Sequence, residues 1–477
     1  MKTRKLLALL LLISFLAACT ASKTEEASLL ITNARVVDVE QGTVQQNRTL
    51  VIRDGQIVEV SDESALQRYR AASTVDAQGK YIIPGLWDNH IHLRGGEDLI
   101  AENENLLPLF IAHGVTTVRD AGGDLYPAIR KWQQQIETGE ITGPRILTAG
   151  PKLDGPNPTW EGSIEVASVA QVPAAMDSLQ QLGVDFVKIY DSTISGDVFL
   201  AIVKEAEARG MQVSGHMPFT ITLRDAMDLG LDATEHLYYA FKASSAKEDS
   251  ITQAIRASQQ TDKPIGFHTA LRMLYDTYAP AVAQQTFNRM AETKTAAVPT
   301  LHISRVLNNL KYEDHSQDAY LPYIGEGIIK TYERRINSAR RSPEESVQFM
   351  RDLNARFHTM VPAMHKAGVT ILAGSDCGAY NSYVYPGISL HKELEMMVET
   401  GLTPAQALRT ATINGARFMN RDEQYGTVAQ GKAADLVMLN ENPLEDISHT
   451  QGIHAVVYGG KVYTAEELKQ LMENIRK

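Results

Sequence analysis

The chain has 477 residues, of which 44% are hydrophobic and 22% are charged. This is the composition of an ordinary globular protein, and it excludes disordered, collagen-like and low-complexity chains. The 46 basic and 57 acidic residues give a net charge of −11, so a basic surface for nucleic acid is not expected. Two cysteines are too few for a disulfide framework or a cysteine-rich zinc module.

The first 20 residues predict an export signal. Basic residues near the start precede the apolar stretch 6–18, which is shorter than the roughly 20 residues that span a bilayer but suits a signal peptide. The stretch ends in Leu-Ala-Ala-Cys, which resembles a bacterial lipobox. We therefore expect removal of residues 1–18 and lipidation of Cys19, which would anchor the protein to a bacterial membrane, with Thr20 indicating the periplasmic side of the outer membrane. An ordinary signal peptide is the alternative.

The two ends of the mature chain predict a small β-sandwich module. Residues 28–83 and 421–465 show alternating, β-branched patterns with turn residues between them, as expected of strands without covering helices. Residues 19–27 are expected to form a tether, and residues 466–477 a C-terminal helix.

Residues 84–420 predict an α/β fold, a (β/α)8 TIM barrel. Short apolar segments alternate with longer helical patterns, and glycines such as Gly183 and Gly368 are placed to end the preceding helices. Helical patterns at 281–293 and 344–366 suggest insertions that cover substrate. The expected strands are residues 85–92, 115–119, 145–149, 185–190, 212–216, 233–236, 296–300 and 370–376.

Potential metal ligands gather at the ends of these strands. His90 and His92 share one face of the first strand, where two imidazoles can converge on one cation. A lysine in the middle of the fourth strand is costly unless it is neutralised or paired. Because the carboxyl ends of barrel strands meet at one mouth, we expect the side chains that lie at these strand ends to gather there: His90, His92, Lys188, His216, His236 and Asp376.

The chain resembles the amidohydrolase superfamily over nearly its full mature length. The resemblance rests on motifs that include PGLWDNHIHL, HGVTTVRDAGG, VDFVKIYD, AGSD and GTVAQGKAADLVMLNENPL, and it is strongest to the imidazolonepropionase-like and prolidase-like dipeptidase and carboxypeptidase branch. It implies two divalent metal ions, with zinc favoured. His90, His92 and Asp376 would hold one metal and His216 and His236 the other, with CO2-carbamylated Lys188 as the bridge.

The same resemblance implies a hydrolytic mechanism. A metal-bridging hydroxide would attack the amide of a peptide or an N-acyl amino acid, and Asp376 would transfer the proton to the leaving amine. Tyr239, favoured slightly over Tyr238, would hydrogen-bond the carbonyl oxygen. Asp88 is expected to orient a ligand imidazole.

One departure from the family pattern concerns substrate recognition. The segment after the third strand, GPKLDGPNPTWEGS, lacks the histidine that related peptidases carry there. Either Lys152, Arg119 or Trp160 binds the substrate carboxylate instead, or the substrate is not a dipeptide. For Arg119, an ion pair with Asp120 that supports the mouth is the favoured prediction.

Three functions stay open at this stage. The first is the binuclear amide hydrolase. The second is a hydrolase that opens imidazolone, lactam or lactone rings, or a one-metal deaminase, against which Lys188 argues. The third is a non-catalytic surface lipoprotein scaffold. The expected partners are a small molecule or short peptide and a membrane through the lipid anchor only, with no nucleic acid and a possible homo-oligomer.

Overall fold

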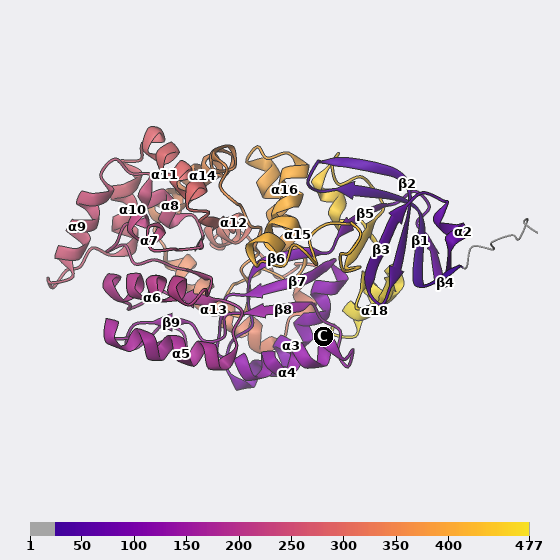
Figure 1. Cartoon of the computed structure of the whole chain (residues 1–477). Helices are drawn as coiled ribbons and strands as arrows, with labels where there is room; N and C mark the ends of the chain where they lie inside the picture. The colour runs from indigo at the N-terminus through magenta and orange to yellow at the C-terminus, as the bar shows by residue number, and fades with distance from the viewer. Residues whose placement is uncertain (1–23, 477) are drawn as a thin grey trace, which may run out of the picture.

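The computed structural model describes residues 24–476. The predicted signal peptide and Cys19 lie outside the described residues. Among the residues that are described, no helix combines the length and the apolar character needed to cross a membrane. A barrel surrounded by helices occupies most of the chain, and a β-sheet module lies at one end of it (Figure 1).

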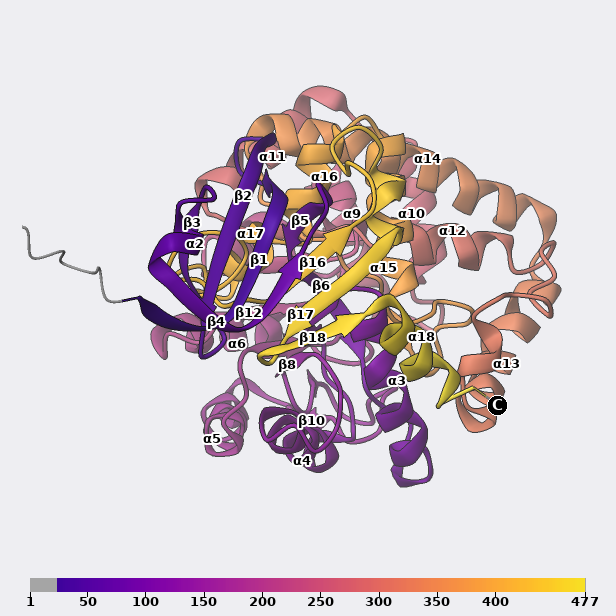
Figure 2. The same cartoon turned by 90° about the vertical axis from the view of Figure 1, so that its right-hand side faces the viewer.

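The module is built from both ends of the described chain, as the sequence predicts. It is one eight-stranded sheet, in which β5 from the N-terminal part pairs antiparallel with β16 from the C-terminal part (Figure 2). The order along its main path is β18-β17-β16-β5-β1-β2-β3, and β4 pairs with β1. The strands are β1 (Glu25–Asp38), β2 (Thr43–Arg53), β3 (Gln56–Ser61), β4 (Tyr69–Asp76), β5 (Tyr81–Pro84), β16 (Leu436–Leu439), β17 (Ile453–Tyr458) and β18 (Lys461–Thr464).

Alternation of side chains explains why this sheet is stable. Alternate apolar residues of β1, β2, β5, β16 and β17 pack into one shared cluster that includes Ile31, Leu50 and Leu436, as expected of strands with one buried face. The first strand begins at Glu25, within the segment 19–27 that the sequence assigns to a tether. After the last strand, Thr464 caps helix α18 (Ala465–Glu473).

The central part of the chain is a parallel barrel, which confirms the predicted fold class. Its strands pair in parallel in two sheets, from β15 to β8 and from β10 to β14. They are β6 (Leu86–His92), β7 (Val115–Asp120), β8 (Arg145–Thr148), β9 (Leu153–Asp154), β10 (Ile164–Glu165), β11 (Val187–Ile189), β12 (Val213–Gly215), β13 (Ala233–Glu235), β14 (Ala296–Val298) and β15 (Cys377–Gly378).

The segment predicted as the eighth strand, residues 370–376, closes the barrel without forming a full strand. It makes one isolated bridge to β14. Its backbone accepts a hydrogen bond from Asn89 N–H at Ala373 (2.9 Å) and donates one from Leu372 to Ala297 (2.9 Å). The segment therefore joins β14 to β6, but its ladder is too short to count as a strand along its whole length.

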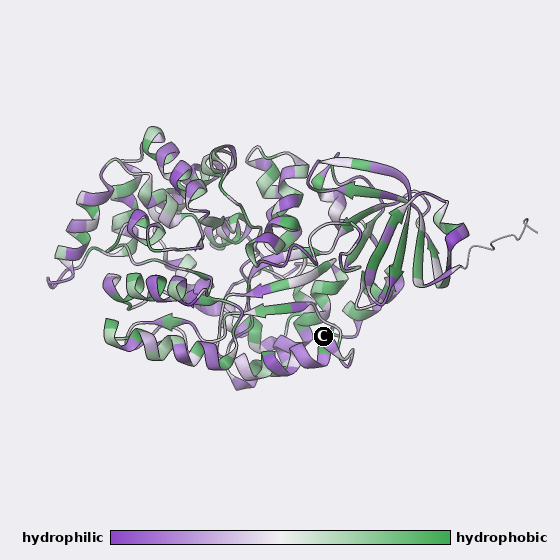
Figure 3. Cartoon of the chain, viewed as in Figure 1, coloured by the Kyte–Doolittle hydropathy of each residue, from purple (hydrophilic) through white to green (hydrophobic). Residues whose placement is uncertain are grey.

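Helices surround the barrel, and their apolar residues pack into one large core cluster, while hydrophilic residues colour the outer helices in part (Figure 3). Gly183 (φ 70°) and Gly368 (φ 90°) end α5 and α14 in the left-handed conformation, as predicted. The two predicted insertions are α11 and α14. The helices of this part are α3 (Ile100–Ala112), α4 (Tyr126–Glu137), α5 (Val172–Leu182), α6 (Gly196–Ala208), α7 (Leu223–Met227), α8 (Tyr238–Ala243), α9 (Glu248–Ser258), α10 (Phe267–Tyr275), α11 (Pro280–Glu292), α12 (Leu301–Asn309), α13 (Glu326–Arg341), α14 (Glu344–Ala367), α15 (Ile388–Glu399), α16 (Pro404–Thr410) and α17 (Ile413–Phe418).

The module packs against the starts of the barrel strands. The N–H of Gly85, directly before β6, donates to Asp435 O (2.7 Å), and Arg145 at the start of β8 pairs with the Asp435 carboxylate (3.0 Å). The opposite end of the barrel, where β6 finishes with His90 and His92, is thus left for the site.

Candidate metal centre

Three imidazoles and one carboxylate converge at the carboxyl ends of the barrel strands. His90 Nε2 lies 3.3 Å from His92 Nε2. Asp376 Oδ1 is 3.5 Å from His90 Nε2 and 3.3 Å from His92 Nε2, and Asp376 Oδ2 is 3.8 Å from His236 Nε2. Ligand atoms of His90, His236 and Asp376 all lie within 4.8 Å of one another, which is the spacing that a shared cation requires.

The fourth predicted imidazole, that of His216, lies beside His236. Their ring centres are 4.8 Å apart and the rings are perpendicular. His216 Nδ1 also lies 3.4 Å from the carboxylate of Asp191, a residue just beyond β11 that the sequence analysis did not select. The structure thus brings all four predicted histidines and Asp376 to one mouth.

Two of these residues have a left-handed backbone. His236 has a φ of 61° and Asp376 a φ of 57°, a conformation that is uncommon outside glycine and asparagine and that clusters at functional sites. The N–H of Asp376 donates to His90 O (2.7 Å). This hydrogen bond fixes the Asp376 backbone against the end of β6.

Lys188 lies in the middle of β11 and is completely buried. Its Nζ is 3.5 Å from Glu235 Oε1, yet it has no hydrogen-bond partner within residues 24–476. Burial lowers the pKa of the Lys188 ammonium group to about 8, although the nearby Glu235 carboxylate opposes that shift. A neutral, nucleophilic amine is therefore accessible near neutral pH.

The carboxylate of Glu235 lies against both His90 and Lys188. The sequence patterns did not indicate this residue. Its Oε2 lies 2.5 Å from His90 Nδ1, and its Oε1 accepts hydrogen bonds from Ser214 (2.7 Å) and Arg119 (3.1 Å). Burial alone would raise the pKa of Glu235, but Lys188, His90 and Arg119 hold it well below its usual value. Glu235 is therefore an anion that orients the His90 ring.

The expectation that Asp88 orients a ligand imidazole is wrong. Asp88 Oδ1 accepts a hydrogen bond from the N–H of Ser375 (2.8 Å) and a longer one from the N–H of His90 (3.4 Å). Asp88 therefore holds the backbone next to Asp376, and Glu235 takes the place beside the ring.

The other histidines are oriented in the same way, through the nitrogen that points away from the centre. His92 Nδ1 lies 3.0 Å from Gly122 O, and His236 Nδ1 lies 2.6 Å from Thr300 Oγ1. Burial lowers the pKa of His92 and of His236 well below the usual value. Neutral imidazoles with their Nε2 atoms directed at a carboxylate, beside an unpartnered buried amine, are a donor set that fits divalent cations such as zinc.

Comparison with known proteins agrees with this geometry. Residues 81–463 match the amidohydrolase family. The chain belongs to that family. The resemblance recognised in the sequence is thus confirmed, and the protein is a metal-dependent hydrolytic enzyme.

Several proteins are similar to this amidohydrolase over most of its chain. It is 22% identical to an ochratoxinase of Aspergillus niger, over 93% of this chain and 88% of that one. It is 23% identical to an adenine deaminase of Lysinibacillus sphaericus, over 93% of this chain and 60% of that one. The solved bottromycin amidohydrolase aligns with a TM-score of 0.71 at 21% identity, over 94% and 90% of the two chains. A prolidase bound to N-methylphosphonate-L-proline aligns with a TM-score of 0.64 at 23% identity, over 91% and 99%. These structures share the fold.

The two tyrosines after β13 have different surroundings in this amidohydrolase. The Tyr239 hydroxyl donates to Asp191 Oδ2 (3.3 Å), and its ring centre is 6.0 Å from that of His216. Tyr238 packs against Phe267 and Phe357, with ring centres 5.2 and 5.3 Å away. Tyr239 therefore places its hydroxyl beside Asp191 and His216, whereas Tyr238 packs against α10 and α14, with its ring centre 6.4 Å from that of His236.

Arg119 does not form the predicted ion pair with Asp120. Its guanidinium is buried, donates to Glu235 and to Asn89 O (2.8 Å), and lies over the ring of Phe186 at 4.2 Å. These contacts place it inside the barrel beneath the centre. It is thus unavailable to a substrate carboxylate, and Lys152 and Trp160 remain from the predicted set.

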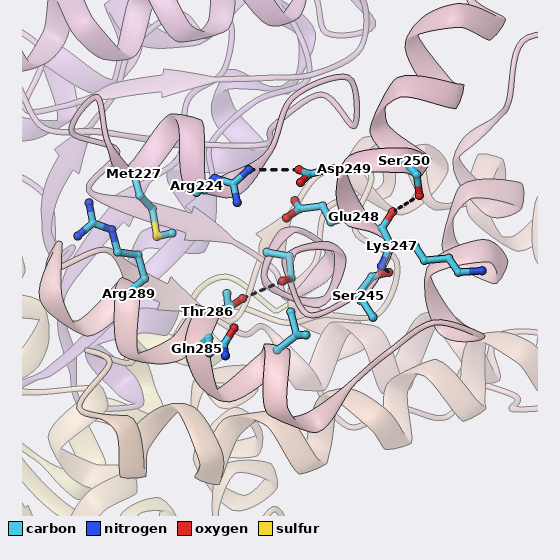
Figure 4. Close-up of a pocket in the computed structure, with 13 residues that line it drawn as sticks. Arg224, Met227, Ser245, Lys247, Glu248, Asp249, Ser250, Gln285, Thr286 and Arg289 are labelled. Atoms are coloured by element: carbon cyan, nitrogen blue, oxygen red, sulfur yellow. Dashed lines mark hydrogen bonds and ion pairs between the residues drawn. The ribbon is translucent and has the colours of Figure 1, made fainter.

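A separate surface pocket of about 470 Å³ lies among α7, α9 and α11 (Figure 4). Oppositely charged side chains line it, and Arg224 pairs with Asp249 across 3.2 Å. None of the predicted metal ligands is among its lining residues. The chemistry of this enzyme is therefore assigned to the barrel mouth.

Proposed function

We propose that this enzyme uses two divalent cations, with zinc the best suited, to cleave the amide bond of a peptide or an N-acyl amino acid. The proposal rests mainly on the surroundings of Lys188. Its amine is buried and has no hydrogen-bond partner among the described residues. A buried amine that makes no hydrogen bond and has one carboxylate 3.5 Å away is costly. A role in the metal centre explains why it is there.

The proposed role of Lys188 is to carry a carbamate. Its neutral amine would attack CO2, forming a nitrogen–carbon bond and releasing one proton, and the product is an anion at the end of the side chain. His90, His92 and Asp376 would hold one cation and His216 and His236 the other. The carbamate between them would offset the repulsion of two close positive charges.

The reaction itself adds water across the amide. When bound, the cations supply an activated water and polarise the substrate carbonyl. Asp376 takes a proton as the new carbon–oxygen bond forms and delivers it to the nitrogen as the carbon–nitrogen bond breaks. Asn381 donates to Asp376 Oδ1 (2.7 Å) and so keeps this carboxylate in place. The Tyr239 hydroxyl is the proposed donor to the carbonyl oxygen.

Ring-opening hydrolysis of an imidazolone, lactam or lactone needs the same groups and is the second candidate. A one-metal deaminase is less well supported despite the similarity to an adenine deaminase, because it gives Lys188 no role. The scaffold prediction is set aside, since the family match supports a hydrolytic enzyme.

We also propose that the protein is exported, that a lipid on Cys19 anchors it to the membrane, and that it self-associates. Mass spectrometry of the N-terminal peptide from bacterial membranes tests the anchor: a diacylglycerol-modified Cys19 is expected, and an unmodified mature N-terminus contradicts it.

A substrate screen tests the activity. The protein without residues 1–19, loaded with zinc in bicarbonate buffer, is incubated with dipeptides, N-acetyl amino acids, lactams and lactones. Release of free amine is measured for the amides and lactams, and release of acid for the lactones. Turnover of linear amides supports the proposal. Turnover confined to cyclic substrates favours the second candidate.

A further inference from the structure

Two buried donors beside the metal centre lack partners. Lys152 follows β8 and is 1% exposed, and its Nζ lies 5.5 Å from the centre of the Trp160 ring. Neither Lys152 Nζ nor Trp160 Nε1 has a hydrogen-bond partner in the part of the chain that the structure describes. Buried polar groups are nearly always satisfied, so these two atoms indicate a ligand that binds here.

A second basic side chain, that of Arg94, also lies close to this indole. The Arg94 guanidinium is buried and stands 4.0 Å from the centre of the Trp160 ring and 5.5 Å from that of Tyr380. It donates to Ala379 O (3.0 Å) and to Asn381 Oδ1 (3.4 Å). Two basic side chains thus border one aromatic ring.

Neither of these basic groups is paired with an acidic side chain among the described residues. Within residues 24–476, neither Arg94 nor Lys152 has a carboxylate within 4.0 Å of its side-chain nitrogens, the limit for an ion pair. The nearby acidic groups are occupied. Asp120 accepts from Leu93 N–H and from the Thr148 hydroxyl, and the carboxylate of Asp124 accepts two backbone N–H groups. The site therefore holds one buried cation, Arg94, and one buried amine, Lys152, and neither has an acidic partner among the described residues.

These two basic groups are connected to the proposed metal ligands through neighbouring side chains. Asn381 accepts from Arg94 through its Oδ1 and donates through its Nδ2 to Asp376 Oδ1. On the other side, the Trp160 ring lies 6.1 Å from that of Tyr190, which in turn lies 4.5 Å from the ring of His216. A chain of contacting side chains thus links these donors to the proposed metal ligands His216 and Asp376.

We propose that Lys152, Trp160 and Arg94 form the subsite that binds the carboxylate of the substrate. Lys152 Nζ and Trp160 Nε1 donate to the carboxylate oxygens, and Arg94 supplies the positive charge. This inference rests on the proposed amide hydrolysis and narrows it. The substrates are dipeptides and N-acyl amino acids with a free carboxylate, and their neutral carboxamides are poor substrates.

Matched substrate pairs test the subsite. N-acetyl amino acids and dipeptides are compared with their C-terminal amides, in the zinc-loaded wild type and in Lys152→Met and Trp160→Phe. We expect the wild type to prefer the acids about 100-fold in kcat/KM. Lys152→Met loses that preference, mainly through a higher KM for the acids, and Trp160→Phe weakens it. Lys131→Met, which removes an exposed lysine on α4, leaves all values unchanged.

A binding measurement separates this inference from the activity. Calorimetric titration with free L-amino acids and L-amino-acid amides reports the subsite without turnover. If the wild type binds the amino acids but not their amides, and Lys152→Met abolishes that binding, the subsite is supported. This holds even if no amide is hydrolysed, in which case only the proposed amide hydrolysis is wrong. Two results would overturn the subsite without contradicting amide hydrolysis. One is hydrolysis of acids and carboxamides at equal rates, and the other is a preference for acids that persists in Lys152→Met.

Discussion

Glu235 Oε2 lies 2.5 Å from His90 Nδ1, although 145 residues separate the two in the chain. The same carboxylate lies 3.5 Å from Lys188 Nζ and accepts from Arg119 and Ser214. One buried anion therefore orients a proposed metal ligand, holds the lysine that is proposed to bridge the metals, and neutralises the arginine beneath them. The metal centre depends on this connection between β6, β7, β11, β12 and β13.

Replacement of this anion tests its role. In Glu235→Gln the His90 ring loses its charged partner, so we expect metal affinity to fall about 10- to 100-fold. Arg119 would also keep its buried charge without the compensating carboxylate, which lowers the free energy of unfolding by about 3 kcal/mol. Metal retained after dialysis against a chelator, and denaturant unfolding, measure the two effects. Ser214→Ala removes one neutral donor from the same carboxylate and should cost less. Unchanged metal affinity in Glu235→Gln would contradict the assigned role.

Asn381 offers a test of Asp376 that leaves Asp376 itself intact. Asn381 Nδ2 donates to Asp376 Oδ1 (2.7 Å), and a hydrogen bond to the charged form of a carboxyl group lowers its pKa. In Asn381→Ala we expect kcat to fall about 10-fold and the acidic limb of the pH–rate profile to move to higher pH. Ser382→Ala, next along the chain, should leave the profile where it is. An acidic limb that stays in place in Asn381→Ala would show that the hydrogen bond does not act on the catalytic proton transfer.

The two tyrosines after β13 give a direct comparison. The Tyr239 hydroxyl lies beside Asp191 and His216, so Tyr239→Phe should reduce kcat about 100-fold through loss of a donor to the carbonyl oxygen. Tyr238→Phe keeps the ring that packs against Phe267 and Phe357 and should retain nearly full activity. Steady-state kinetics of both variants decide the assignment. Equal losses, or a larger loss in Tyr238→Phe, would reverse it.

A buried carboxyl group outside the metal centre predicts how stability changes with pH. Glu393 on α15 accepts hydrogen bonds from the N–H groups of Leu301 (2.9 Å) and His302 (2.7 Å), and burial raises its pKa to about 7. The folded state therefore holds this proton more tightly than the unfolded chain. The resulting stabilisation is complete below the unfolded pKa and is lost as the pH rises from about 4.5 to about 7, by about 3 kcal/mol in total.

Denaturant unfolding across that pH range measures the effect. Glu393→Gln should remove this part of the pH dependence, whereas Glu399→Gln, at the end of the same helix and paired on the surface with Arg305, should preserve it. If Glu393→Gln unfolds with the same pH dependence as the wild type, the proton on Glu393 does not contribute to the change in the free energy of unfolding with pH.

The sequence was enough to predict the barrel and the positions of the candidate ligands. Gly183 and Gly368 end helices where the strand pattern resumes, and period-two alternation places His90 and His92 on one face of β6. Strand ends of a parallel barrel must meet. The gathering of distant histidines and Asp376 at one mouth therefore follows from local patterns and from the fold.

The supporting residues could not be predicted in this way. Glu235 directly precedes His236, and strict alternation along a strand would turn the two side chains in opposite directions. The left-handed backbone of His236 (φ 61°) breaks that alternation at the strand end, so both side chains serve the centre. The assignment of Asp88 failed for a related reason, because its partner is a backbone N–H of Ser375, and nothing in the local sequence indicates that contact.

The proposed pair of metals depends on Lys188 as its bridge. The most direct test of this bridge is the zinc content of the protein without residues 1–19, prepared in 13C-labelled bicarbonate, beside a carbon NMR spectrum of the same sample. For the wild type we expect two zinc ions per chain and a carbamate signal. In Lys188→Ala we expect the signal and at least one zinc ion to be lost. Lys242→Ala, which removes a different buried lysine, should keep both. The carbamate bridge would be contradicted if the wild type held one zinc ion and no carbamate, and if Lys188→Ala had the same metal content.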